Sequence, residues 1–486
     1  MARTSQSQQF RGSSAIMAGM SEEHSRTTPP IQDDLPNLIR MLREPAGDDP
    51  RFASLEAIEA NRQAFTEKVH ATWKYLHGRS LDEILAIEGI LTPDRRKKLP
   101  EDFVWYLERT ITLWRRVNDA IVWSLVRHQD HVIRTVCHRK ERVRLTDANP
   151  KALRRFLDEI NEDPLTIAIW SDATSCVDVG DVLCRSFSGK LDGFFEVKEG
   201  TMNDRILDLM GVKGTPDEIV REIVAFADKY GTKAMKQLER VAKQRHRYNQ
   251  YMDIIDDDRG FDPRREAEVT ILESRIELKS YDDELQAAID VSRHAPALHC
   301  IDHCLWVYFD QNSSKTPAEK IADFERELAK TSPTTLKWFR EHFGPNQPFE
   351  PVVLEGNLTC PEAIPLFLRL LQPETVRDVL IGKLMFSVFL FVDWHELGRI
   401  LADFGAELAW STAKKGRTER TKPEPKRLLT IGDRIPRVQV SDGRYLEGFS
   451  KIYRVLFEGI TPTSIAAQYV EALKSGNTLN RRAAAH

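Results

Sequence analysis

The sequence predicts an α/β protein of the mixed α+β kind, in which helices flank a mixed β-sheet. Apolar residues recur three and four apart between residues 103 and 125, the pattern of one face of a long helix. Short apolar runs at 165–170, 177–184 and 191–197 are typical of strands, and residues 204–212 return to a helical pattern. Because helices precede and follow these strands, we expect a sheet that is covered by helices.

The composition divides the chain of 486 residues into four parts. Residues 1–35 are rich in Ser, Gln and Thr-Pro, which predicts a disordered tail, although their early Arg and Ser also fit a transit peptide. A helical portion follows at 36–144, and the strands with their flanking helices form a core at 145–255. An acid-rich stretch with Gly and Pro marks a boundary at 256–265, and an α+β portion without an indicated role extends over 266–480.

The overall composition excludes several classes of protein. A net charge of −4 argues against coating nucleic acid by bulk charge, and six cysteines without a CxxC pair are too sparse for a disulfide framework. The longest apolar run, 384–392, is too short for a membrane span, which needs roughly 20 residues. No nucleotide-binding P-loop is found. We expect a cytoplasmic protein without membrane contact, and either a homo-oligomer or a partner protein stays open.

Two of the predicted strands carry acidic and basic side chains. Asp181 lies in the strand predicted at 177–184. Glu196 and Val197 end the strand predicted at 191–197, and Lys198 follows it directly. A turn is predicted between the two strands, at 185–190. Because side chains alternate between the two faces of a strand, Glu196 and Lys198 point the same way. Burying two carboxylates and an ammonium costs free energy unless they pair or hold a metal. We therefore expect the charged side chains to converge on one pocket.

This arrangement, over about residues 177–210, resembles the PD-(D/E)xK nuclease superfamily, in which an acid at a strand end and an acid-x-lysine on the next strand build a divalent-metal site. Gly180 stands where the family frequently has proline. The resemblance implies a restriction-endonuclease-like core that hydrolyses phosphodiester bonds of nucleic acid, with DNA favoured over RNA. Two alternatives stay open: a structural ion pair on an exposed hairpin, and a nuclease fold without activity that acts as a nucleic-acid or protein binding module.

The resemblance also implies roles for individual residues. Asp181, Glu196 and the backbone carbonyl of Val197 would bind Mg2+ or Mn2+, because these ions prefer hard oxygen ligands. Lys198 would orient or deprotonate the attacking water, or stabilise the charge that develops on the phosphate. The chain is therefore predicted to be a metal-dependent endo- or exonuclease.

Four further residues are candidates for such a site. The superfamily commonly takes an extra acid from an upstream helix, and the candidates here are Glu108, Asn118 and Asp119. Asn118 lies on the apolar stripe of its helix, where a polar side chain is either a hydrogen-bonded core amide or part of a polar pocket. Asp119 lies off that stripe and is expected to face solvent. Asn203 begins the next predicted helix, either as its N-cap or as a contact with substrate.

A cationic stripe is predicted on the helix after the hairpin. Its members recur at steps of four, three and four residues and so share one helix face: Lys236, Arg240, Lys243 and Arg247. Glu239 is the single acid among them. Such a stripe can follow a phosphate backbone, because each neutralised phosphate releases counterions. An ordinary solvated helix face is the alternative.

A His and Cys cluster offers a different function. On a helix, His299 would pair with His303, and Cys300 with Cys304, at a spacing that can bind zinc, which would make the chain a zinc-dependent regulator. The aromatic and β-branched residues that follow favour a strand instead. Residues four apart in a strand are roughly 13 Å distant and cannot share one ion. The strand is therefore our expectation.

The remaining C-terminal segments predict both helix and strand. Residues 361–405 have a helical pattern with the apolar run 384–392 at its centre. Residues 414–427 carry seven basic residues and two prolines, which predicts a mobile surface loop. Residues 431–440 predict a strand and residues 445–457 a helix.

Overall fold

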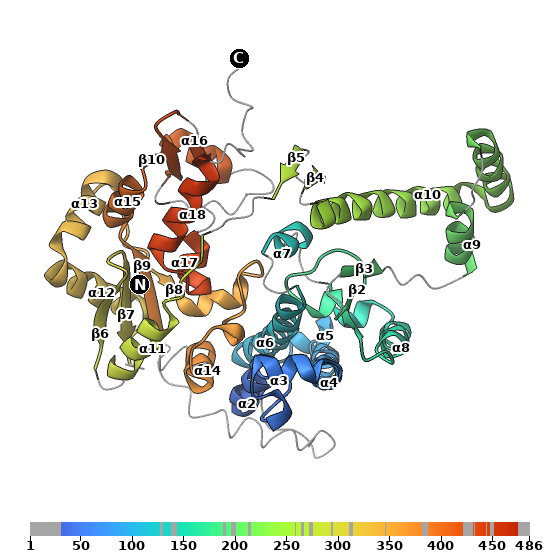
Figure 1. Ribbon diagram of the computed structural model, residues 1–486, viewed down its shortest axis with the longest axis horizontal. Coiled ribbons are helices and arrows are strands. Elements are labelled where there is room, and N and C mark those ends of the chain that lie inside the picture. The colour runs from blue at the N-terminus through green and yellow to red at the C-terminus, as the bar shows by residue number, and fades with distance from the viewer. Residues whose placement is uncertain are drawn as a thin grey trace. The chain divides into compact units, whose positions relative to one another are not determined.

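The protein is described from a computed structural model (Figure 1), which covers residues 31–126, 130–137, 143–187, 191–195, 201–211, 215–257, 259–263, 267–271, 276–292, 295–310, 314–345, 347–381, 387–420, 431, 433–443, 445–447 and 452–474. These residues form two compact units. The four-stranded unit comprises the described parts of Met1–Asn37, Tyr281–Glu355 and Leu370–Gly398. The hairpin unit comprises those of Leu38–Ser280, Gly356–Arg369 and Arg399–His486.

Both units combine helices with antiparallel sheets, which confirms the mixed α+β class. Each unit is assembled from three separate segments of the chain, whereas the sequence suggests continuous portions. The predicted boundaries at 145 and 266 therefore stay predictions. Among the described helices, none is both long enough and apolar enough to span a bilayer.

Helices occupy the chain ahead of the first strand, as predicted: α2 (Ile31–Arg43), α3 (Leu55–Ala60), α4 (Arg62–Ile90), α5 (Pro93–Arg96), α6 (Glu101–Leu125), α7 (Asp130–Val136) and α8 (Pro150–Ile160). The tail predicted at 1–35 extends too far, because α2 already begins at Ile31. Leu35, Leu38 and Leu42 are buried at helical spacing on α2, which explains why the helix forms although it contains a proline. The rest of the predicted tail lies outside the described residues.

The core of the hairpin unit contains an antiparallel sheet of β1 (Thr166–Trp170), β2 (Val182–Ser186) and β3 (Leu191–Phe195), in that order. The central strand is β2, since Val182 is paired with Trp170 on one side and with Phe195 on the other. Helix α8 precedes the sheet in the chain and α9 (Thr201–Met210) follows it. The predicted order of helix, three strands and helix is therefore confirmed.

The segment before β2 differs from the sequence prediction. The strand expected over 177–184 begins only at Val182, after a turn in which Gly180 has a φ of +68°. A Cβ at this position would lie 3.0 Å from the Cβ of Phe194. Proline cannot adopt this conformation, because its ring fixes φ near −65°. The turn therefore requires glycine at the position where the resembled family frequently has proline.

Helix α10 (Pro216–Asp257) is broken into two halves at Gly231, whose φ of 74° and ψ of −175° are not helical. The two halves and α9 enclose a small core of buried side chains: Ile206, Phe226, Ala234, Leu238 and Val241. The second half, 232–257, therefore has one face packed and the opposite face available to solvent.

The hairpin unit ends with smaller elements. β4 (Arg259–Asp262) pairs with β5 (Ala267–Thr270), and a second antiparallel sheet contains β10 (Ala406–Trp410), β11 (Pro436–Val440) and β12 (Tyr445–Glu447). The helices are α16 (Ala413–Arg420), α17 (Ile452–Glu458) and α18 (Pro462–Lys474). The loop prediction for 414–427 is wrong for its first half, which is helical in α16, and residues 421–427 lie outside the described part.

The four-stranded unit has an antiparallel sheet in the order β6-β7-β9-β8, formed by β6 (Ala297–Ile301), β7 (Leu305–Asp310), β9 (Ser387–Val392) and β8 (Val352–Val353). Its helices are α11 (Asp282–Val291), α12 (Pro317–Thr331), α13 (Pro333–Phe343), α14 (Pro373–Ile381) and the start of α15 (Trp394–Asp403). The helical prediction for the apolar run is wrong at 387–392, because its β-branched and aromatic residues form β9 between β7 and β8.

The turn before β2 gives a test of the described sheet. Gly180→Ala should lower the free energy of unfolding by about 1–3 kcal/mol, because it combines a left-handed φ with a close contact to Phe194. Gly78→Ala in α4 is the control: an added Cβ there meets no atom within 4 Å, so stability should stay equal or rise by up to about 1 kcal/mol. Denaturant unfolding of both variants measures this. A Gly180→Ala variant as stable as wild type would contradict the turn.

Candidate functional site

Asp181 lies directly before β2, at the end of the sheet where β1 and β3 finish. Its backbone N–H donates a 2.8 Å hydrogen bond to the carbonyl of Phe195, and its carbonyl accepts a 2.9 Å bond from the N–H of Ser171. Its side chain is half-buried. The structure thus holds Asp181 beside the last residue of β3, and Glu196 is the next residue in the chain.

The other predicted members of the site are Glu196, Val197 and Lys198, and all of them lie outside the described residues. Their convergence with Asp181 therefore stays a prediction. Within the described part of the chain, no group of three or more His, Cys, Asp or Glu side chains is placed to hold a metal ion.

Asp119 is buried, so the prediction that it faces solvent is wrong. Its Oδ1 accepts hydrogen bonds from the backbone N–H of Ser175 at 2.6 Å and of Cys176 at 3.1 Å. The prediction failed because helical periodicity assumes one exposed face, whereas α6 is buried on all sides from Arg116 to Trp123. The carboxylate holds the segment between β1 and β2 instead of facing a substrate.

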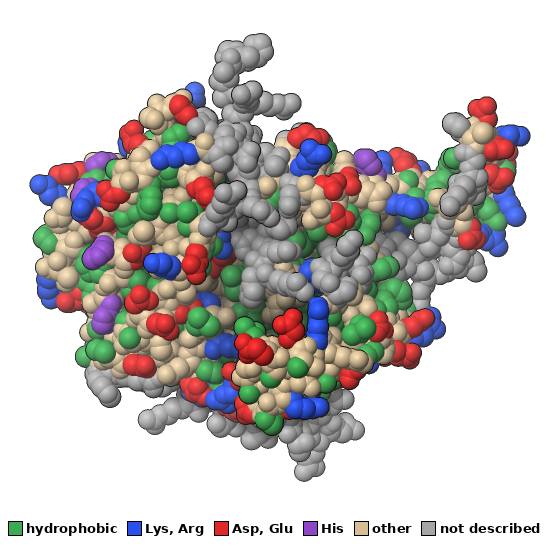
Figure 2. Space-filling view, in the orientation of Figure 1, with side chains coloured by type: hydrophobic (Ala, Val, Ile, Leu, Met, Phe, Trp, Pro, Cys, Tyr) green, Lys and Arg blue, Asp and Glu red, His purple; other side chains and the backbone are tan. Residues whose placement is uncertain are grey.

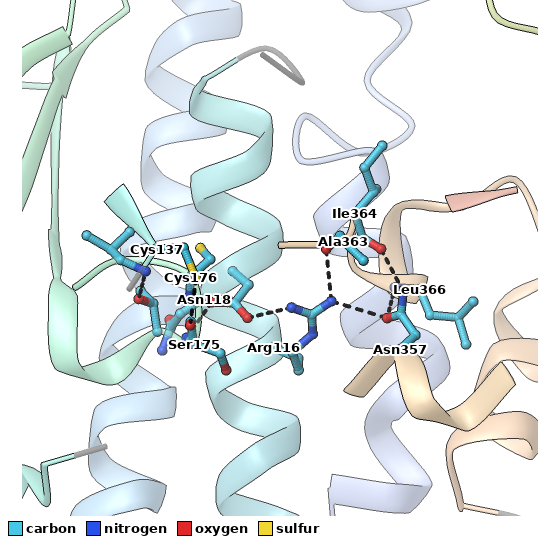
Figure 3. A network of polar contacts seen from close by, with 12 residues as sticks. Arg116, Asn118, Cys137, Ser175, Cys176, Asn357, Ala363, Ile364 and Leu366 are labelled. Carbon is cyan, nitrogen blue, oxygen red and sulfur yellow. Dashed lines mark hydrogen bonds and ion pairs between the residues drawn. The ribbon is translucent and has the colours of Figure 1, made fainter. Parts of the chain in front are cut away.

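The second oxygen of Asp119 binds a buried arginine (Figure 3). Arg116 Nη1 lies 2.8 Å from Asp119 Oδ2, and the two side chains are 1% and 0% exposed. Arg116 Nη2 donates to Asn357 Oδ1 and to the Ala363 carbonyl, both at 3.2 Å. Arg116 Nε has no hydrogen-bond partner among the described residues, but both Nη atoms and both carboxylate oxygens have near partners, so the pair can persist without solvent.

Asn118 is a hydrogen-bonded core amide, the first of the two alternatives that the sequence leaves open. Its Nδ2 donates to the Ala173 carbonyl at 2.8 Å, and its Oδ1 accepts from Ser80 Oγ at 2.9 Å. The same Oδ1 lies 3.0 Å from Nδ1 of His77. Both ends of the amide are therefore used to join α4, α6 and the segment after β1.

His77 is a polar core residue that the sequence analysis missed. The backbone N–H of Trp170 donates to its Nε2 at 3.1 Å, so Nδ1 carries the proton and donates to Asn118 Oδ1. Burial lowers the pKa of His77 to about 4. The signal was available in the sequence, since His77 recurs at helical spacing with the buried Trp73 and Ser80.

Glu108 lies apart from these residues. Its Oε1 forms a 2.7 Å ion pair with Arg96 Nη2, and about half of each side chain is exposed. Glu108 precedes Asn118 by ten residues on α6, which corresponds to about 15 Å along a helix axis. The structure therefore does not bring the helix candidates Glu108 and Asn118 together.

The cationic stripe lies on the second half of α10. Lys236, Arg240, Lys243 and Arg247 are all exposed, which agrees with both the phosphate-binding and the solvated-face interpretation. Lys243 Nζ forms a 2.7 Å ion pair with Glu239 Oε1.

Tyr248 joins this helix to the hairpin. A Cβ added to Gly193 in β3 would lie 2.5 Å from Tyr248 Oη, and the Tyr248 ring packs edge-on against Phe194 with 6.4 Å between ring centroids. Burial raises the pKa of Tyr248, and a backbone hydrogen bond at Phe194 opposes that shift. The stripe therefore ends next to β3.

Asn203 is the third residue of α9, so the N-cap prediction is wrong. The helix begins at Thr201, before the predicted start at 204. The side chain of Asn203 is not among those described, and its predicted contact with substrate stays a prediction.

The His and Cys cluster forms a hairpin, which confirms the strand interpretation. His299 and Cys300 lie in β6, and His303 is in the turn that leads to β7, with a φ of 56°. His299 Nε2 lies 3.1 Å from Ser292 Oγ, whereas the Cys304 thiol donates to the Asp393 carbonyl at 3.3 Å. These partners differ, so the structure gives no support to a shared zinc site.

Comparisons with protein-family models, with curated proteins and with solved structures give no match for this chain. Function is therefore inferred from its own residues.

The buried His77 predicts a pH dependence of stability. Its pKa is about 4 in the folded state against an ordinary value of 6.5, so the unfolded chain takes up the proton first as pH falls. Its contribution, about 3 kcal/mol, is present above pH 6.5 and lost as pH falls toward 4. Thermal unfolding should show a shallower fall in Tm between pH 6.5 and 4 for His77→Gln than for wild type. Identical pH profiles would contradict this role.

Proposed function

We propose that this chain is a metal-dependent nuclease whose site forms at the end of the β1-β2-β3 sheet. The observation that carries the proposal is the hydrogen bond from the Asp181 N–H to the Phe195 carbonyl. It holds an acid at the start of the central strand beside the chain that continues into Glu-Val-Lys at 196–198. The order of α8, three strands and α9 is compatible with the restriction-endonuclease-like core that the sequence resembles, whereas the three described strands are all antiparallel and the mixed sheet of that core stays a prediction.

The residue types at this sheet end suit a hard divalent cation. Asp181, Glu196 and the carbonyl of Val197 would hold Mg2+ or Mn2+ through oxygen ligands, and the side chain of Asp181 is half-buried. The bound ion would polarise the phosphate. Lys198 would orient the attacking water or balance the negative charge that develops on the phosphate oxygens.

The proposed substrate is nucleic acid, with DNA favoured over RNA. The chain carries a net charge of −4, so binding to a polyanion requires a local basic surface. The exposed stripe of α10 offers such a surface, and Tyr248 holds its end against β3, the strand that leads to Glu196.

A nucleic-acid or protein binding module without catalytic activity is the second candidate. One observation favours it: Asn118 and Asp119, two of the three helix candidates for an additional site residue, have their polar atoms engaged in the core. If the upstream helix supplies nothing to the metal, the site rests on three consecutive residues and Asp181 alone.

Cleavage assays separate these candidates. Purified protein is incubated with linear, circular and single-stranded DNA, with and without Mg2+. Lys198→Ala should reduce metal-dependent cleavage at least about 100-fold, because a positioned charge at the developing oxyanion is lost, while Tm stays unchanged. Lys97→Ala, an exposed lysine after α5, is the control and should cleave like wild type. Full-rate cleavage by Lys198→Ala would exclude the proposed site, and binding without cleavage by wild type would favour the binding module.

A further inference from the structure

The α10 helix has an unusual concentration of positive charge. Between residues 229 and 247 the sequence has seven lysines and arginines and a single acid, Glu239, in a chain with a net charge of −4. On the face of the molecule seen in Figure 2, in contrast, acidic and basic side chains are interspersed. A local excess of this kind on one helix attracts polyanions, although the whole chain does not.

The stripe lies on a continuous stretch of helix, and most of its charges have no carboxylate partner among the residues that the structure describes. It begins after the break at Gly231, and its eleven-residue span from Lys236 to Arg247 corresponds to about 17 Å of helix. Glu239 is paired with Lys243. For the other three stripe residues, the described part of the chain provides no carboxylate within 4.0 Å. Their charges are available to an external anion.

The exposed face of this helix has no Phe, Tyr or Trp ring for base stacking; His246 is exposed there and carries an imidazole. Tyr248 and Tyr251 are the Phe, Tyr or Trp residues of the second half of α10. Tyr251 is 3% exposed, and Tyr248 packs on Gly193 and Phe194. Proteins that bind single strands combine cations with aromatic side chains on which the bases stack, and each stacked base contributes about 1–3 kcal/mol to binding. The stripe has the cations without a Phe, Tyr or Trp ring.

We propose that the second half of α10 binds the phosphate backbone of double-stranded nucleic acid, independently of base sequence and of any metal. This inference rests on the proposed function in taking nucleic acid as the ligand. Along 17 Å of axis a duplex presents about ten phosphates and a single strand about five, so a row of cations gains more from a duplex. Contacts to phosphate alone carry no base information, hence the independence of sequence.

The anchoring of the helix fixes the direction of the bound duplex. Tyr248 packs against β3, so Arg247 is the stripe residue nearest to the sheet, and Lys236 lies about three helical turns away. The stripe would then hold about five base pairs on one side of the sheet end, at about 3.4 Å per base pair.

Binding in EDTA tests this proposal separately from hydrolysis. Fluorescence anisotropy is measured with a duplex DNA, a duplex RNA and the corresponding single strands, between 50 and 200 mM KCl. Because Lys243 is paired with Glu239, wild type has three free cations for phosphate, and the plot of log K against log salt should have a slope of about −2.7 for the DNA duplex. The duplex should also bind more tightly than the single strand. Equal binding of the RNA duplex would support backbone recognition.

Two variants and a matched control locate the surface. Replacing Lys236, Arg240, Lys243 and Arg247 together by Gln should remove most of the slope. The control carries the same change of charge at exposed residues elsewhere in the hairpin unit: Arg62→Gln, Lys68→Gln, Lys97→Gln and Lys98→Gln. Glu239→Gln should release Lys243, tighten duplex binding several-fold and steepen the slope by about 0.9.

Three results would overturn the proposal: tighter binding of the single strand, equal weakening by the control variant, or unchanged affinity in Glu239→Gln. EDTA removes divalent metal, so binding is measured without hydrolysis. If wild type binds the duplex in EDTA but does not cleave it when Mg2+ is restored, the nuclease proposal is contradicted and the duplex surface stays supported. Cleavage that survives loss of the stripe would support the nuclease proposal and contradict the duplex surface.

Discussion

The hairpin unit depends on one buried ion pair, that between Arg116 and Asp119 on α6. Asp119 accepts two backbone N–H groups from the segment between β1 and β2, and Arg116 reaches Asn357 and Ala363, more than two hundred residues later in the chain. A buried pair is costly to desolvate, and removing one partner of such a pair typically costs about 3–5 kcal/mol. The pair therefore fixes three distant segments at once.

The neighbouring Asn118 extends this network toward the sheet. Through His77 it reaches the backbone of Trp170, the last residue of β1, and through Nδ2 it holds Ala173. Asn357 continues the network on the other side, where it donates to the carbonyls of Ile364 and Phe457. The chain is thus held on its way from β1 to Gly180, which sets the position of Asp181. A catalytic side chain requires such support, because small displacements lower its effect.

Much of the fold could be predicted from periodicity. The stripe of α6 and the strands β1, β2 and β3 follow from apolar spacing, and the His and Cys hairpin follows from its aromatic and β-branched residues. Asp119 could not be placed this way, because periodicity distinguishes two helix faces and α6 is enclosed on all sides. The run at 387–392 was assigned to a helix because a continuous apolar stretch fits a buried helix and a central strand equally. For the candidate site, the sequence indicates which residue types occur together, and the position of Asp181 is what the structure adds.

The proposed function requires Asp181 to be a ligand of a divalent metal at the end of this sheet. Calorimetric titration with Mn2+ of wild type and of Asp181→Asn tests it most directly, with thermal unfolding to confirm that both proteins are folded. Saturable binding near one equivalent in wild type, and its loss in a variant with unchanged Tm, is the predicted result. Absence of binding in wild type, or unchanged binding in Asp181→Asn, would contradict the claim.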